Sequence, residues 1–70
     1  MNASYTAVIK QADGWWIGWI EEVPGVNCQE GSRDELVDSL RDALREALEI
    51  NRRDALDAAG EEYDEQTIAL

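Results

Sequence analysis

Two runs of residues in the first third of the chain, 4–11 and 15–22, have the pattern of the paired strands of a β-hairpin. Residues 4–11 are rich in β-branched and aromatic side chains, and the pattern resumes over residues 15–22 after Asp13-Gly14, a typical hairpin-turn dipeptide. Successive side chains of a strand point to opposite sides of the sheet. The second strand therefore has two apolar faces, one with Trp15, Ile17 and Trp19 and the other with Trp16, Gly18 and Ile20.

A second turn is predicted at Pro24-Gly25. Proline presets φ for the first turn position, and glycine accepts the positive φ of the second. A short third strand is predicted to follow over residues 26–29.

The pattern changes to a helical period after Ser32. Ser32 and Glu35 have the spacing of a capping box, in which each side chain bonds to the backbone amide of the other residue. Apolar residues then recur at three- and four-residue spacing, which places them on one stripe of a helix. They are Leu36, Val37, Leu40, Ala43, Leu44, Ala47 and Leu48. Helices often end at a glycine in the left-handed conformation, and Gly60 suits that role, so the helix is predicted over residues 33–59.

These elements predict a single α+β domain over residues 1–70. It has a three-stranded antiparallel sheet, a long helix and a short C-terminal strand at residues 66–70, where the chain ends in a β-like run. The helix would be about 40 Å long, whereas six-residue strands reach only about 20 Å. Its second half must overhang the sheet, bend or meet another element.

One helix can cover only one face of this sheet, although both faces of the second strand are apolar. Each Trp can bury on the order of 200 Å², and an exposed apolar patch of several hundred Å² generally marks an interface. We therefore expect a contact with a partner or a second copy through whichever set the helix leaves open. The candidate contact residues are Trp15, Trp16, Ile17, Trp19 and Ile20, together with Glu21 and Glu22. The alternative is that a bulge or the C-terminal segment shields both faces.

Charge and composition narrow the classes of function. Sixteen Asp or Glu against six Lys or Arg give a formal net charge of −10, which repels phosphate backbones and favours a basic partner. With no His and one Cys, the chain has neither a usual zinc site nor an internal disulfide, and we predict no catalytic, metal or cofactor site. Self-association is expected for so small a chain. No leader or membrane-spanning run is evident, so a cytoplasmic protein is expected.

The motifs together resemble the HicB-like antitoxin domain. The order and spacing of Asp13-Gly14, the two aromatic residues Trp15-Trp16, Glu22-Val23-Pro24-Gly25 and Gly31 match that family. So do Ser32-x-x-Glu35-Leu36 and Leu40-x-x-Ala43-Leu44, and the match covers Tyr5 to about Glu49. Only ten residues follow Gly60, so the resemblance is to a short form lacking the C-terminal DNA-binding domain.

The resemblance implies a β-β-β-α-β domain with a degenerate RNase H-like arrangement and no nuclease activity. It also implies assembly as a dimer or tetramer and neutralisation of a small basic HicA-type toxin, an mRNA-cleaving ribonuclease. An RNase H-type metal site needs converging carboxylates, and residues 4–10 contain none. The alternative function is a stand-alone homo-oligomeric module of the same fold without a toxin partner.

Overall fold

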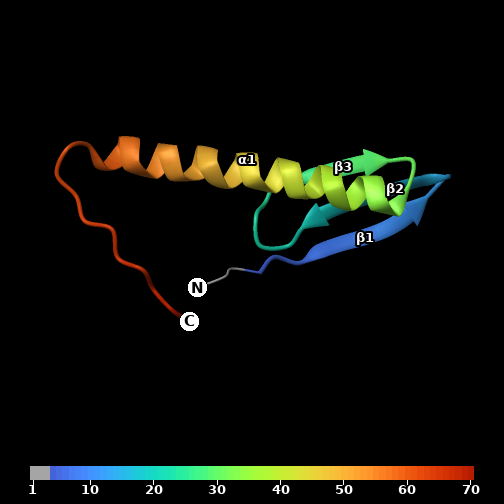
Figure 1. Cartoon of the computed structure of the whole chain (residues 1–70), viewed down its shortest axis with the longest axis horizontal. Helices are drawn as coiled ribbons and strands as arrows, with labels where there is room; N and C mark the ends of the chain where they lie inside the picture. The colour runs from blue at the N-terminus through green and yellow to red at the C-terminus, as the bar shows by residue number, and fades with distance from the viewer. Residues whose placement is uncertain (1–3) are drawn as a thin grey trace.

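The computed structural model describes residues 4–70 and contains three strands followed by one helix (Figure 1). The strands are β1 (Ala7–Ala12), β2 (Trp15–Ile20) and β3 (Asn27–Glu30), and the helix is α1 (Arg33–Ala59). The strands form one antiparallel sheet in the order β1-β2-β3. The predicted α+β fold of an antiparallel sheet and one long helix is thus confirmed, while residues 1–3 of the predicted domain lie outside the described residues.

The β1–β2 hairpin closes through a two-residue turn. Both Asp13 and Gly14 have positive φ, at 52° and 82°, which is the type I′ geometry whose twist suits paired strands. Ala12 pairs with Trp15, and the register continues to Ala7 opposite Ile20. Both strands are shorter than their predicted ranges of 4–11 and 15–22 because the chain turns away after Ile20.

The β2–β3 connection is the predicted Pro-Gly turn. Gly25 has φ of 92°, and the amide of Val26 donates to the carbonyl of Val23 at 3.4 Å across the turn. The amide of Ile20 donates to the carbonyl of Val26 at 3.1 Å, which holds the end of β2 against the start of the returning chain. Val23 and Val26 are both buried, so this loop contributes side chains to the core.

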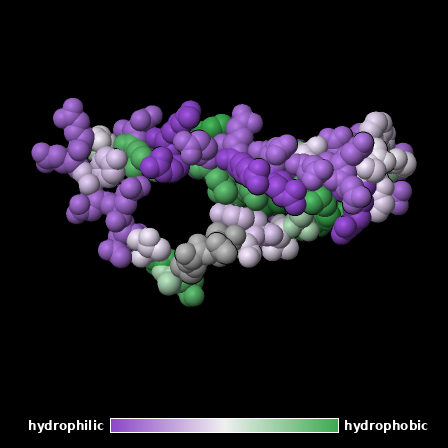
Figure 2. Space-filling model, viewed as in Figure 1, coloured by the Kyte–Doolittle hydropathy of each residue, from purple (hydrophilic) through white to green (hydrophobic). Residues whose placement is uncertain are grey.

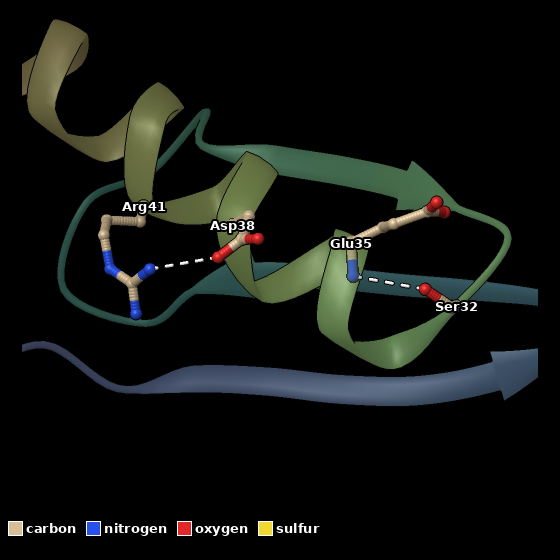
Figure 3. A network of polar contacts seen from close by, with 4 residues as sticks. All are labelled: Ser32, Glu35, Asp38 and Arg41. Atoms are coloured by element: carbon tan, nitrogen blue, oxygen red, sulfur yellow. Dashed lines mark hydrogen bonds and ion pairs between the residues drawn. The ribbon is translucent and has the colours of Figure 1, made fainter.

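The α1 helix begins at the predicted cap. Ser32 Oγ accepts a hydrogen bond from the amide of Glu35 at 3.2 Å (Figure 3). Among residues 4–70, this is the one bond of the capping box that forms, since the Glu35 side chain makes no bond back to the Ser32 amide. One turn later, Asp38 and Arg41 form an exposed ion pair at 3.1 Å. The helix ends at Gly60, whose amide donates to the carbonyl of Leu56.

The core lies between α1 and the part of the sheet formed by β2 and β3. Leu36 and Leu40 are fully buried and pack with three further buried residues, Ile20, Val23 and Val26. Gly18 sits beneath the helix, where a Cβ would lie 3.1 Å from Leu40 Cδ1. The missing side chain therefore lets α1 approach the middle of β2 closely.

The second half of α1 extends beyond the sheet, as the orange end of the helix shows in Figure 1. The partly buried residues that pack on the core end at Leu48, and Ile50 is already 47% exposed. An ion pair between Glu49 and Arg53 at 3.2 Å, four positions apart in the sequence, lies on this overhang.

The C-terminal strand predicted at residues 66–70 is not formed. Residues 61–70 have no regular secondary structure, and every one of them is exposed. The β-like composition of the last residues is overridden by their position, because α1 carries the chain past the sheet before it turns back (Figure 1). An isolated segment of high β-propensity does not form a strand without a pairing edge and an apolar face to cover.

Candidate interaction surface

The helix α1 covers one face of the sheet and leaves the other face exposed. Gly18 points toward Leu36 and Leu40 of α1, so the alternate residues Trp16 and Ile20 share the side covered by the helix. Trp15, Ile17 and Trp19 must therefore lie on the opposite side. Trp15 is 50% exposed and Trp19 is 41% exposed, whereas Ile20 is only 6% exposed. Neither α1 nor the C-terminal segment shields the two indoles.

The strand register identifies the neighbours of these tryptophans. Val8 and Asn27 lie on either side of Trp19, Lys10 and Gln29 lie on either side of Ile17, and Ala12 pairs with Trp15. Directly paired residues of an antiparallel sheet project to the same side. We call this set the open sheet face; it consists of Val8, Lys10, Ala12, Trp15, Ile17, Trp19, Asn27 and Gln29.

The candidate contact residues predicted from the sequence are divided by the sheet. Trp15, Ile17 and Trp19 belong to the open sheet face, where a partner can reach them. Trp16 and Ile20 instead pack with the core because the helix lies over them. The apolar pattern of β2 favoured neither set, and the structure leaves only the first available at the surface.

Glu21 and Glu22 follow β2 at one end of the sheet, and both are exposed. The amide of Glu21 donates to the carbonyl of Thr6 at 2.9 Å, and Oε1 of Glu22 accepts from the amide of Thr6 at 2.7 Å. This hydrogen bond from the Thr6 backbone lowers the pKa of the Glu22 carboxyl, because the charged form is the better acceptor. Glu22 therefore ties the two strand ends together, while Glu21 lies exposed directly after β2.

Lys10 was missed by the sequence analysis as a candidate. It is the only lysine in the chain and lies exposed in the middle of β1, between Val8 and Ala12 on the open sheet face. The available signal was its position in the alternating pattern, which puts it on the same side as those two apolar neighbours.

The helix side of the sheet contains polar groups that stabilise the fold. Ser39 Oγ of α1 donates to Oε2 of Glu30 at 2.6 Å, which joins the helix to the end of β3. Cys28 is half-buried beside it. Burial, and secondarily the charge of Glu30, raise the pKa of its thiol, so the reactive thiolate is disfavoured.

The described part of the chain offers no enclosed site for small-molecule chemistry. Residues 4–70 form no pocket and contain no group of three or more Cys, Asp or Glu side chains placed to hold a metal ion. Over the same residues, α1 is too polar to serve as a membrane-spanning helix. The exposed indoles of Trp15 and Trp19 make the open sheet face the main candidate site.

Comparison with known proteins gave no match: no family model, curated protein or solved structure matches this chain.

Proposed function

We propose that this chain is a HicB-like antitoxin that binds and neutralises a small basic HicA-type mRNA-cleaving toxin. The observation that supports a binding role is the open sheet face, where Trp15 and Trp19 are exposed on a chain of 70 residues. Exposed, clustered indoles on a small protein are typical of binding surfaces. The motifs from Asp13-Gly14 to Leu40-x-x-Ala43-Leu44 supply the family part of the proposal.

The distribution of charge supports a basic partner. Exposed carboxylates follow the outer side of α1, and the segment after Arg53 contains carboxylates but no basic residue. In the first half of α1 these carboxylates, which are interspersed with the exposed Arg41 and Arg45, are Asp34, Glu35, Asp38, Asp42, Glu46 and Glu49. Figure 2 shows hydrophilic residues along the outside of the helix and hydrophobic ones gathered beneath it. Such a surface attracts a basic protein at long range and raises the association rate more than the final affinity.

The proposed mechanism is occlusion rather than catalysis. A HicA-type ribonuclease must bind RNA through a basic surface, and an acidic protein seated there blocks that surface without breaking any bond. The proposal includes the family's degenerate RNase H-like arrangement, of which the observed β-β-β-α order would be the first part. It also places the protein in the cytoplasm, where such a toxin meets mRNA.

The test is co-expression with the product of the neighbouring gene, followed by a pull-down and an mRNA-cleavage assay. We expect a stable complex, inhibited cleavage and an association rate that falls steeply as ionic strength rises. The absence of a basic neighbour that binds the chain would overturn the antitoxin proposal and favour the stand-alone homo-oligomeric module. An association rate that does not depend on salt concentration would refute the proposed electrostatic contribution to toxin binding.

A matched pair of variants locates the toxin contact. Replacing Asp42 and Glu46 on α1 with Asn and Gln removes two exposed charges without removing a buried contact. We expect slower toxin association from this variant. The control replaces Glu61 and Glu62 in the same way beyond the end of the helix. An equal effect of the two pairs would show that only net charge matters, and no effect of either would exclude the outer side of α1 as the contact.

A further inference from the structure

We propose that the free edge of β1 pairs antiparallel with the same edge of a second copy of this chain, so that the two sheets join into one continuous sheet. The contact uses the backbone of β1 and leaves the open sheet face of each copy exposed. The inference goes beyond the proposed function, because it assigns a surface other than the open sheet face and does not require the toxin.

Two hydrogen bonds show which backbone groups of β1 face outward. The amide of Glu21 donates to the carbonyl of Thr6, next to β1, whereas the amide of Ile20 donates to the carbonyl of Val26, next to β3. Backbone groups of successive strand residues point to opposite edges of the strand. Every second residue from Thr6 onward therefore bonds to β2, and the residues between them point their amides and carbonyls away from the sheet. We call these the outward residues of β1; they are Ala7, Ile9 and Gln11.

No described segment covers this edge. β1 is the first strand in the order β1-β2-β3, α1 packs mainly against β2 and β3, and residues 61–70 have no regular structure. Proteins usually protect an exposed edge with charges, a proline or a bulge. β1 has no proline, its register with β2 is unbroken, and Lys10 is its one charged residue. An edge of this kind is therefore available to pair with another strand.

The sequence of β1 is complementary to itself in one antiparallel register. With Ile9 of one copy opposite Ile9 of the other, Ala7 pairs with Gln11, and every outward amide and carbonyl finds a partner. Val8 then lies opposite Lys10 of the other copy. The register centred on Lys10 instead sets the two ammonium groups directly opposite each other, which is destabilising because their charges are alike. The register centred on Ile9 is thus the one we expect.

The distribution of charge allows two acidic chains to meet at this edge. Each chain has a formal net charge of −10, yet residues 4–12 contain no carboxylate. The helix lies over β2 and β3, and neighbouring strands are about 4.8 Å apart, so the two helices would lie about 20 Å from each other across the joined edge. That separation is about twice the Debye length of about 8 Å in physiological salt. Repulsion between the two helices is therefore largely screened.

Edge pairing also changes the surface that a further partner meets. Antiparallel strands of one sheet are related by a two-fold axis perpendicular to the sheet, so both open sheet faces lie on the same side of the dimer. Three strands of six residues cover about 20 by 14 Å, or roughly 300 Å² in projection, and the joined sheet doubles this area. Trp15 and Trp19 of both copies then belong to one continuous surface, and both helices lie on the other side.

The test follows amide hydrogen exchange of the full chain by NMR at about 20 µM and about 1 mM. One strand edge buries less than the 800 Å² or so per partner of a standard interface, so we expect a dissociation constant of about 100 to 300 µM. The outward residues of β1 should then exchange about threefold more slowly at the higher concentration, because the dimer protects their amides. The amides of Asn27 and Gln29, which point away from the sheet at the free edge of β3, should exchange equally fast at both concentrations.

A matched pair of variants locates the contact. Gln11 and Gln29 are both exposed, and each has an outward amide, one at either edge of the sheet. Proline is tolerated at such an edge position because the lost amide makes no bond within the sheet. We expect Gln11→Pro to weaken self-association about tenfold or more in sedimentation equilibrium, and Gln29→Pro to weaken it less than about threefold, because only the first removes bonds between the copies. Urea unfolding establishes that both variants are folded.

Several outcomes would overturn the proposal. Exchange of the outward amides that does not depend on concentration would do so, even in a chain that dimerises, because the dimer would then use another surface. Equal effects of Gln11→Pro and Gln29→Pro would also do so. Loss of protection in Ile68→Pro would assign the edge to the C-terminal segment instead. Protection without toxin binding supports this inference and refutes the antitoxin function, whereas toxin binding without protection does the reverse.

Discussion

Adding one methyl group at Gly18 is the sharpest test of how the helix sits on the sheet. A Cβ at this position would lie 2.9 Å from the backbone carbonyl oxygen of Val8 and 3.2 Å from Leu36 Cδ2. Contacts below 3.0 Å are essentially absent from real structures, and the Val8 oxygen belongs to the backbone of β1, so it cannot rotate away. Gly18→Ala therefore forces the helix and the strands apart.

The expected loss follows from two opposing terms. Overpacking a close-packed core costs about 1 to 3 kcal/mol, whereas replacing glycine with alanine restricts the unfolded chain and returns about 0.4 to 1 kcal/mol. We expect a net loss of about 1 to 2 kcal/mol for Gly18→Ala. A 70-residue domain is stable by roughly 4 to 10 kcal/mol, so this loss is a substantial fraction of the total.

Urea unfolding followed by far-ultraviolet circular dichroism measures this loss, with Gly31→Ala as the matched control. Gly31 does not have positive φ, and its added Cβ would meet only Glu35 Oε2 at 3.8 Å, an ordinary contact. We expect that control to unfold at the same urea concentration as the natural chain or slightly above it. Both variants are compared at one protein concentration, because self-association of the folded chain would add stability by mass action. If Gly18→Ala unfolds together with Gly31→Ala, the close approach of α1 to β2 is refuted.

Three further predictions concern single side chains. Ser32 Oγ caps the Glu35 amide, so Ser32→Ala should lower the free energy of unfolding by about 1 kcal/mol and Ser32→Gly by only a few tenths. Urea unfolding measures both losses. Equal losses would contradict the role of Ser32 as the cap. Burial raises the pKa of the Cys28 thiol, so iodoacetamide should alkylate Cys28 more slowly at neutral pH than it alkylates a thiol in an unfolded peptide. Equal rates of alkylation would contradict the burial of Cys28. The Glu22 carboxyl, followed by NMR, should titrate below its ordinary pKa of 4.5. Its contribution to stability is present above that value and is lost as the pH falls through the lowered pKa; Glu22→Gln should remove this acid dependence.

Local signals allowed most of the fold to be predicted from the sequence. The positive φ values of Asp13 and Gly14 satisfy the hairpin turn that this dipeptide predicted, and Ser32 caps the helix that its capping box predicted. Each of these elements depends on residues within about four positions of one another, which is the range over which turn and cap chemistry acts. The missing strand at residues 66–70 shows the opposite case. That strand could form only by pairing with an edge of the sheet, which is distant in the sequence. The β-propensity of residues 66–70 does not provide such a pairing.

The exposed face could not be chosen from alternation alone, because both sides of β2 are apolar. The decisive residue is Gly18, the only member of β2 without a side chain. Leu36 and Leu40 can approach the strand only on the side where that gap lies. A glycine in the middle of an apolar strand can mark a close backbone approach, and this general rule would have favoured the correct side. Lys10 was not predicted because the candidate contact residues were chosen around the tryptophans of β2, and no residue of β1 was included.

The overhang of α1 also makes the helix length independent of the core. Past Leu48, no described residue packs against the helix strongly enough to fix where it must stop, and Gly60 alone marks its end. Each residue inserted there would rotate the departing acidic segment by about 100° around the helix axis and shift it by about 1.5 Å. Small insertions can therefore direct this segment to any side of the helix axis without changing the sheet or its two exposed tryptophans, Trp15 and Trp19.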